Sequence, residues 1–198
     1  TMKLKGTIVM RFAGREFDLP LDTLKFEGAV ISKGGPNVSC AQEFKPLPNI
    51  LLEDFNPKSK TFGQKFDFND TKGKRLAVLM GAGWCASCIS QAEYMEKIKQ
   101  DFIKQGRDDF QMIVINAESA QAPEHQKAML GHAGKEITFP ALQAVSSKEG
   151  WGAFGGKKND CFMYFNNGQL AFKHIGKATV QLGQFDTEVR NGLSMDPE

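Results

Sequence analysis

The feature that most constrains the fold is a pair of cysteines placed directly after a buried strand. The apolar run RLAVLM (Arg75–Met80) leads into GAGWCASCIS, in which two residues separate Cys85 from Cys88. The next segment, 86–105, has apolar residues at the spacing of an amphipathic helix, and Gly106 ends it. This succession of strand, turn and helix indicates an α/β fold with both cysteines at the strand–helix turn.

The rest of the main part of the chain alternates between strand and helix patterns. Short apolar or alternating runs predict strands, and a 3.6-residue period predicts helices. The expected strands are 66–70, 110–116 and 137–145, the expected helices are 118–134 (beginning near Pro123) and 179–189, and a hairpin is expected over 161–175 with Asn167–Gly168 as its two-residue turn. This order predicts a central mixed β-sheet with helices on both faces.

Residues 1–45 follow a different pattern. KLKGTIVMRF, REFDLPL and TLKFEGAVI alternate apolar and polar residues, which is typical of half-buried antiparallel strands. Residues 45–49 contain two prolines and are expected to be extended linker. We therefore expect an N-terminal β-rich extension and linker over 1–45 and the main α/β domain over 46–198.

Composition argues against several classes of protein. With 41% apolar and 24% charged residues, the chain has ordinary globular composition rather than that of a disordered protein. A net charge of +2 gives no sign of a nucleic-acid-binding surface. The longest apolar runs are too short to span a membrane, and no signal peptide is visible at the start. Nothing in the composition indicates the oligomeric state.

Cys85 is expected to be the reactive sulfur. Unpaired backbone N–H groups and the positive end of the helix dipole stabilise a thiolate at the first turn of a helix. The pKa of Cys85 should therefore be lowered, which makes it the nucleophile. Cys88 lies one turn further along the same face and is placed to resolve a mixed disulfide. Trp84 is expected to cover the site and limit the access of water.

Other uses of a cysteine pair fit less well. A copper site usually has a longer loop, and a permanent disulfide across one helical turn restrains the chain very little. A zinc site needs a second pair of ligands. The remaining candidates contain no closely spaced pair: Cys40, Cys161, His125, His132 and His174. The pattern favours a redox pair, with no metal and no cofactor.

Several stretches resemble a known superfamily. KGKRLAVLMGAGWCASC, preceded by NPKSKTFGQKFDFND, resembles the thioredoxin-like superfamily in the manner of TlpA/ResA-type proteins. The segments GAGWCASCISQAEYMEKIKQDF, DDFQMIVINAES, ITFPALQAV and KKNDCFMYFNNGQLAFKHIG are similar to the N-terminal domain of selenoprotein P, in the same order. The resemblance covers roughly residues 47–190 and leaves 1–45 without a counterpart.

The resemblance implies a thioredoxin-like fold for the main domain. It implies that Cys85 stands where selenoprotein P has selenocysteine and that Cys88 is the resolving cysteine. The implied partners are protein or small-molecule thiols and disulfides, with peroxides as a further class. The implied location is extracytoplasmic, either periplasmic or secreted, with any signal peptide removed.

Two positions depart from the acid–base pattern of these relatives. Thioredoxins have a buried Asp six residues before the first cysteine, where this chain has Leu79. TlpA/ResA-type proteins have a Glu six residues after it, where this chain has Gln91. Resolution by Cys88 is therefore expected to be slow at neutral pH, or to rely on water or on the substrate.

A further departure concerns the cis-proline that faces the redox pair in thioredoxins. Counting back from the hairpin glycine, Asn159 or Asp160 occupies that position. We expect these two residues to face the sulfurs and the Phe139–Pro140 pair to end an earlier strand. A cis bond at Pro140, packed on Cys85, would instead give that role to Pro140.

The two other cysteines carry weaker signals. Cys161 opens a hairpin strand and fits a buried core position, although a third redox sulfur near the pair is the alternative. A Cys40–Cys161 disulfide is a further possibility that the sequence does not decide.

Three functions follow for the chain as a whole. The leading one is a thiol–disulfide oxidoreductase, the second is a thiol-dependent peroxidase that passes through a sulfenic acid on Cys85, and the third is a binding module that uses the pair as a redox sensor.

Overall fold

The structure is a computed structural model that describes residues 7–12, 15–20, 46–176 and 181–195. It divides into two units, Thr1–Gln42 and Glu43–Glu198. In the first unit, β1 (Thr7–Phe12) and β2 (Arg15–Pro20) pair as the antiparallel strands expected from their alternating pattern. The third strand expected there, over 23–31, lies outside the described residues.

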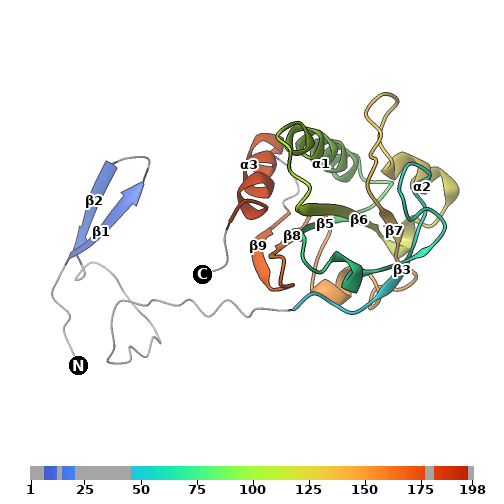
Figure 1. Ribbon diagram of the computed structural model, residues 1–198, viewed down its shortest axis with the longest axis horizontal. Helices are drawn as coiled ribbons and strands as arrows, with labels where there is room; N and C mark the ends of the chain where they lie inside the picture. Colours follow the sequence, from blue (N-terminus) through green and yellow to red (C-terminus); the bar gives the residue numbers. More distant parts are fainter. Residues whose placement is uncertain (1–6, 13–14, 21–45, 177–180, 196–198) are drawn as a thin grey trace. The chain divides into compact units, whose positions relative to one another are not determined.

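The second unit is built on a seven-stranded sheet in the order β4-β3-β7-β6-β5-β8-β9 (Figure 1). Its strands are β3 (Leu51–Asp54), β4 (Lys65–Asp67), β5 (Arg75–Gly81), β6 (Phe110–Asn116), β7 (Ala141–Gln143), β8 (Cys161–Tyr164) and β9 (Leu170–His174). The central strands β5, β6 and β7 are parallel, and the outer strands pair antiparallel. The predicted mixed sheet is therefore confirmed.

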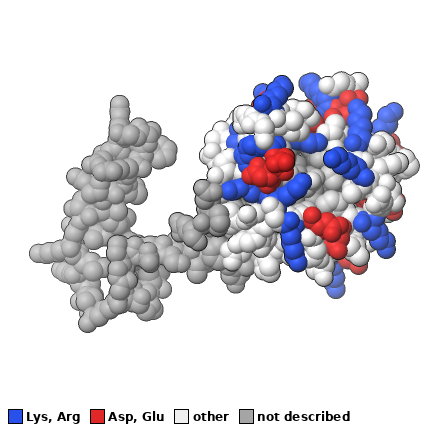
Figure 2. All heavy atoms as spheres, in the orientation of Figure 1, with Lys and Arg blue, Asp and Glu red and all other residues white. Residues whose placement is uncertain are grey.

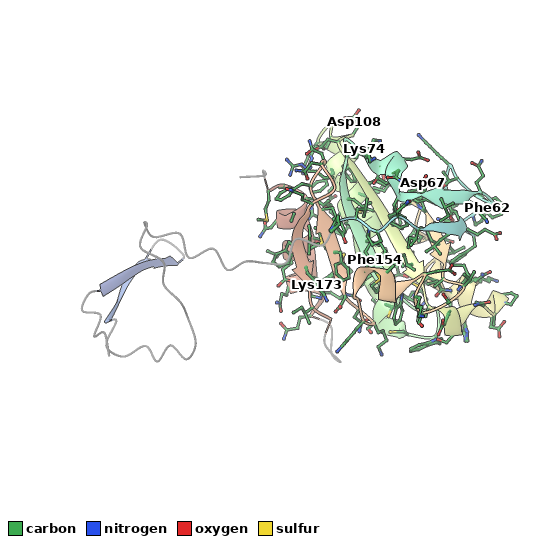
Figure 3. The ribbon with its side chains drawn as sticks, turned by 90° about the horizontal axis from the view of Figure 1, so that it is seen from below. Phe62, Asp67, Lys74, Asp108, Phe154 and Lys173 are labelled. Carbon is green, nitrogen blue, oxygen red and sulfur yellow. The ribbon has the colours of Figure 1, made fainter. Side chains whose placement is uncertain are left out.

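Helical segments cover both faces of this sheet. The α-helices are α1 (Ala86–Lys104), α2 (Pro123–Met129) and α3 (Leu182–Gly192), and the 3-10 helices are η2 (Phe68–Thr71), η3 (Glu118–Ala120) and η4 (Trp151–Phe154). Because side chains alternate along β5, Leu79 packs in one core with α1 and α3, whereas Val78 packs in a second core with η2 and η4. Phe154 of η4 belongs to the second core (Figure 3).

Three expected elements are shorter than predicted. The strand expected over 66–70 stops at Asp67, whose carboxylate caps η2 by accepting from the backbone N–H of Asn69. The helix expected over 118–134 is reduced to η3 and α2, and it is followed by Gly131 and Gly134 with positive φ. The strand expected over 137–145 pairs only through β7.

Strand β7 begins late because side chains bind the preceding backbone. The Nδ2 group of Asn56 donates to the carbonyls of Ile137 and Phe139, at 3.1 and 2.7 Å. These carbonyls are therefore satisfied without a neighbouring strand. Strand β3, which the sequence did not predict, pairs with β7 just beyond this point.

The closing hairpin differs from its prediction in its turn. The backbone N–H of Phe165 donates to the carbonyl of Gln169, so the loop has three residues, 166–168. Gly168 has φ +80, the left-handed conformation that ends a three-residue hairpin loop. The expected hairpin is confirmed, and its two-residue turn was wrong.

The redox pair lies at the end of the sheet where the parallel strands finish. Lys74 and Asp108, which precede β5 and β6, lie at the opposite end (Figure 3). On the face shown in Figure 2, basic and acidic side chains are interspersed. No helix within the described ranges is long and apolar enough to cross a membrane.

Candidate active site

Cys85 occupies the N-cap of α1, directly after the turn that follows β5. Its backbone is extended (φ −109, ψ 102), and its carbonyl accepts from the N–H groups of Cys88 and Ile89 at 3.0 and 3.1 Å. The turn before it is held by a bond of 2.9 Å from the N–H of Cys85 to the carbonyl of Ala82. The sulfur therefore lies at the positive end of a 19-residue helix.

Two residues that sequence reasoning missed hold this turn in place. Asn116, at the end of β6, accepts from the N–H of Gly83 at 3.0 Å, and its amide group donates to the side chain of Gln143 at 2.9 Å. Gly83 packs so tightly on α2 that a Cβ would lie 1.8 Å from the carbonyl oxygen of His125. A polar residue closing the apolar run FQMIVIN was the available signal for Asn116.

The two cysteines differ in exposure and in acidity. Cys85 is 6% exposed and Cys88 is fully buried, and both are free thiols. Burial acts to raise the pKa of Cys85, but hydrogen bonds with Cys88 and Ser87 and the charge of Lys158 outweigh it, so this pKa is lowered. Burial, reinforced by the hydrogen bond to Cys85, raises the pKa of Cys88 to about 12. At neutral pH, Cys85 is thus the sulfur disposed to ionise and Cys88 the one that keeps its proton.

The side chain of Asn159 meets both sulfurs. Its Oδ1 lies 2.9 Å from Cys88 Sγ and 3.7 Å from Cys85 Sγ, and it accepts from Ser87 Oγ at 3.3 Å. Ser87 Oγ is also 3.2 Å from Cys85 Sγ, so its single proton serves one partner at a time. A single carboxamide oxygen therefore organises the polar groups around the redox pair.

The backbone of Asn159 is unusual and closely packed. Its φ of +71 is left-handed, a conformation that asparagine tolerates better than most residues. A Cβ on Gly176 would lie 2.4 Å from Asn159 Cβ, so only glycine leaves room for this loop. Gln91, fully buried on α1, donates from Nε2 to the carbonyl of Asn159 at 3.2 Å. The Oε1 atom of Gln91 has no hydrogen-bond partner among the described residues.

Asp160 supports the loop rather than contacting the sulfurs. Its carboxylate accepts from the N–H groups of Gly176 and Lys157, each at 2.9 Å, and pairs with Lys173 Nζ at 2.9 Å. Lys173 lies on β9 (Figure 3). The bonds of Asp160 thus fix the segment that carries Asn159.

Trp84 covers the site less than expected. Its side chain is 48% exposed, its Nε1 donates to Ser119 Oγ at 3.3 Å, and Lys158 Nζ lies 5.5 Å from its ring centroid. The indole therefore forms part of the surface beside Cys85 rather than a closed lid.

The remaining candidate residues lie in the core. Phe139 is 1% exposed, and the carbonyl of Pro140 accepts from the N–H of Val114 in β6. The Phe139–Pro140 bond is trans, in keeping with its assignment to an earlier strand. Cys161 is fully buried as a free thiol, and burial raises its pKa. Cys40 lies outside the described residues, so the Cys40–Cys161 disulfide stays an untested possibility.

The described part of the chain contains no group of three or more His, Cys, Asp or Glu side chains that could hold a metal ion. The polar groups around the sulfurs are the amides of Asn159 and Gln91, the hydroxyl of Ser87 and the charge of Lys158. Their arrangement stabilises a thiolate at Cys85 and keeps the thiol of Cys88 protonated.

Comparison with known proteins agrees with this geometry. The family profile described as Redoxin matches residues 39–158. The thioredoxin-like protein YneN of Bacillus subtilis is 29% identical over 101 residues, which are 51% of this chain and 53% of YneN. The chain thus matches about half the length of that curated relative.

Solved structures show the same fold at low sequence identity. A thiol:disulfide interchange protein of the thioredoxin family from Chlorobium tepidum is 21% identical, with 76% of this chain and 97% of that one covered and a TM-score of 0.57. The thioredoxin domain of a thiol-disulfide oxidoreductase from Bacteroides vulgatus is 14% identical, with 76% and 96% covered and a TM-score of 0.58. The thioredoxin-like fold is thereby confirmed, and the closer similarity to selenoprotein P stays a prediction.

Proposed function

The chain belongs to the Redoxin family, and we propose that it is a thiol–disulfide oxidoreductase in which Cys85 is the nucleophile and Cys88 the resolving thiol. One observation carries the proposal: two sulfurs within one helical turn have pKa values moved in opposite directions. Cys85, which is 6% exposed, has the lowered pKa, and Cys88, which is fully buried, keeps its proton.

The exchange proceeds in two steps. The Cys85 thiolate attacks one sulfur of a substrate disulfide, which forms a mixed disulfide and releases the other sulfur as a thiolate. Cys88 then attacks Cys85 Sγ, which closes the Cys85–Cys88 disulfide and releases the second substrate sulfur, to which the proton of Cys88 passes. Two electrons move from the protein to the substrate, and the same steps in reverse oxidise a dithiol.

Asn159 is a positioning residue for the second step. Its Oδ1 accepts from Cys88 Sγ at 2.9 Å and lies 3.7 Å from Cys85 Sγ. Among the described residues, no carboxylate is bonded to Cys88, so the proton of Cys88 leaves with the departing substrate sulfur.

Insulin reduction in the presence of dithiothreitol tests the proposal. Cys85→Ser should lower the rate to that of dithiothreitol alone, and Cys88→Ser should accumulate a mixed disulfide visible by mass spectrometry. Cys161→Ser is the matched control, because its sulfur is fully buried, and should retain the wild-type rate. Equal rates in Cys85→Ser and wild type would refute the proposal.

The other functions predicted from the sequence give different results with the same variants. A peroxidase would consume hydrogen peroxide faster than free cysteine does and would form a sulfenic acid on Cys85. A redox-sensing binding module would fold normally and be inactive in both assays. The extracytoplasmic location is part of the proposal, and fractionation of the source cells tests it.

A further inference from the structure

A cavity of about 260 Å³ lies beside the segment that carries the redox pair. It is bounded on one side by Ala117–Ser119 and on the other by Trp151 and Gly152 of η4 and by Gly156, which follows η4. Nothing in the exchange mechanism uses these residues.

The cavity is linked to the redox turn from both sides. On the first side, Ala117 N–H donates to the carbonyl of Gly81 at 2.9 Å, and Ser119 Oγ accepts from Trp84, the residue before Cys85. On the second side, the segment after Gly156 leads within three residues to Asn159, which touches both sulfurs. Both links place the cavity within a few residues of the redox pair.

The lining has an apolar floor and a polar rim with one charge. Ala117, Ala144 and Trp151 supply apolar surface, and Trp151 is held by a bond of 2.9 Å from its Nε1 to the carbonyl of Ile115. The rim carries serine hydroxyls and the carboxylate of Glu118, which is the one charged side chain among the described residues of the lining. Within the described part of the chain, this carboxylate has no ion-pair or hydrogen-bond partner.

These features fit a long side chain with an apolar stem and a cationic end. Lysine and arginine bury their methylene groups on apolar surface while their charged heads stay near water. Lys158 lies over the Trp84 ring and does not line the cavity, so Glu118 is the charged residue of the described lining. Just outside the lining, a second carboxylate, that of Glu149, accepts from Ser146 Oγ at 3.3 Å. We propose that the cavity is a subsite for a basic side chain next to the substrate cysteine, a specificity that rests on the proposed oxidoreductase function.

Disulfide-linked tetrapeptides test the subsite. The probes are homodimers of acetyl-Gly-X-Cys-Gly-amide with X as Lys, Gln or Glu, mixed with excess reduced protein and quenched with acid to give second-order rate constants. We expect the Lys peptide to react about two- to fivefold faster than the Glu peptide, the range that one exposed charge pair supports. Glu118→Lys should invert that order, because the rim then attracts the acidic probe.

Two further variants separate the subsite from general charge effects. Asp70→Lys makes the same change in net charge near the opposite end of β5 and should keep the wild-type preference. Ser147→Phe, at an exposed lining position, should fill the cavity and remove the preference without abolishing reduction of the Gln peptide. Equal rate constants for the three peptides in the wild type would overturn the subsite and leave the oxidoreductase function standing.

If no peptide is reduced, the oxidoreductase function is refuted, but the subsite is not. A binding measurement then tests the subsite by itself. The chain has two tryptophans, so Trp84→Phe leaves Trp151, in the cavity wall, as the single emitter. The redox-inert peptide acetyl-Gly-Lys-Ser-Gly-amide should change its emission saturably and more strongly than the Glu analogue. No difference between these two peptides would refute the subsite.

Discussion

Replacing Asn159 by aspartate should shift the reactivity of Cys85 to higher pH. The Oδ1 atom lies 3.7 Å from Cys85 Sγ, so the substitution places a carboxylate oxygen where an uncharged one stands. Two unit charges at 3.7 Å repel by about 1.1 kcal/mol in water and by about 4.5 kcal/mol at an effective dielectric constant of 20. At about 1.4 kcal/mol per pH unit, the midpoint of Cys85 ionisation should rise by roughly 0.8 to 3.3 units.

The pH dependence of alkylation measures this shift. Reduced protein is treated with iodoacetamide between pH 4 and pH 10, and mass spectrometry of the peptide that contains Cys85 gives the rate at that sulfur alone. Because the thiolate is the reacting form, the midpoint of the profile reports its ionisation. The introduced carboxylate titrates together with the thiols, so the variant's profile should have two steps.

Asn159→Gly is the matched neutral control. Glycine adopts the left-handed backbone of this position without strain and removes the carboxamide without adding charge. Its midpoint should lie much closer to that of the wild type than the midpoint of Asn159→Asp does. Two results would refute the positioning role. The first is a shift of the Asn159→Asp midpoint by less than about 0.3 pH units, which is below the shift expected in water. The second is a shift no larger than that of Asn159→Gly, because either result means that the side chain does not contact the sulfurs.

Three other substitutions or conditions test the packing and acidity of the site. Gln91→Glu should speed the decay of a mixed disulfide, because it places a base one helical turn from Cys88; an unchanged decay rate would contradict this expectation. The same substitution should lower the free energy of unfolding by about 1–3 kcal/mol in urea titrations. The new carboxylate is buried, so its pKa should rise on folding. The loss in the free energy of unfolding should therefore grow as the pH increases through that raised pKa. Gly83→Ala should destabilise the fold by about 1–3 kcal/mol because its Cβ meets His125. A Cβ on Gly183 would meet open space, so Gly183→Ala should be neutral or stabilising by up to about 1 kcal/mol. Equal changes in the free energy of unfolding for Gly83→Ala and Gly183→Ala, measured in urea, would refute the close packing of Gly83 on His125. Since the pKa of Cys88 is raised to about 12 on folding, the unfolded chain loses this proton first. Cys88 should therefore contribute a loss of stability of up to about 1.4 kcal/mol per pH unit above about pH 8.5 in the reduced protein, and Cys161, whose pKa burial also raises, should add to it. The slope should be shallower in Cys88→Ala by the contribution of Cys88.

The long and strongly patterned elements of the fold were predictable from the sequence. Strands β5 and β6 and helix α1 have their predicted bounds to within a residue, because continuous apolar runs and an uninterrupted helical period leave few alternatives. Strand β3 and the start of β7 were not predictable, since the contacts of Asn56 with Ile137 and Phe139 join residues more than eighty positions apart. Local propensity carries no information about such pairs.

The residues of the candidate site likewise include some that were predictable from the sequence and some that were not. The turn that carries Cys85 and Cys88 follows from its sequence spacing, and counting from the hairpin glycine brought Asn159 to the pair. The same count did not separate Asn159 from Asp160, whose carboxylate turns away to bind Lys173. Asn116 was missed because it acts from the end of a neighbouring strand, across the sheet.

The sequence by itself determined that a nucleophilic cysteine and its partner lie at the start of a helix after a buried strand, since periodicity and spacing are properties of local segments. Only the tertiary structure decided what surrounds them. It brings Asn159 from the segment before β8 and Gln91 from α1 into one hydrogen-bonded group, and it places a cavity lined by the carboxylate of Glu118 nearby. The acidity of Cys85 and Cys88 depends on burial and on these long-range contacts, and burial exists only once the sheet and its helices have packed.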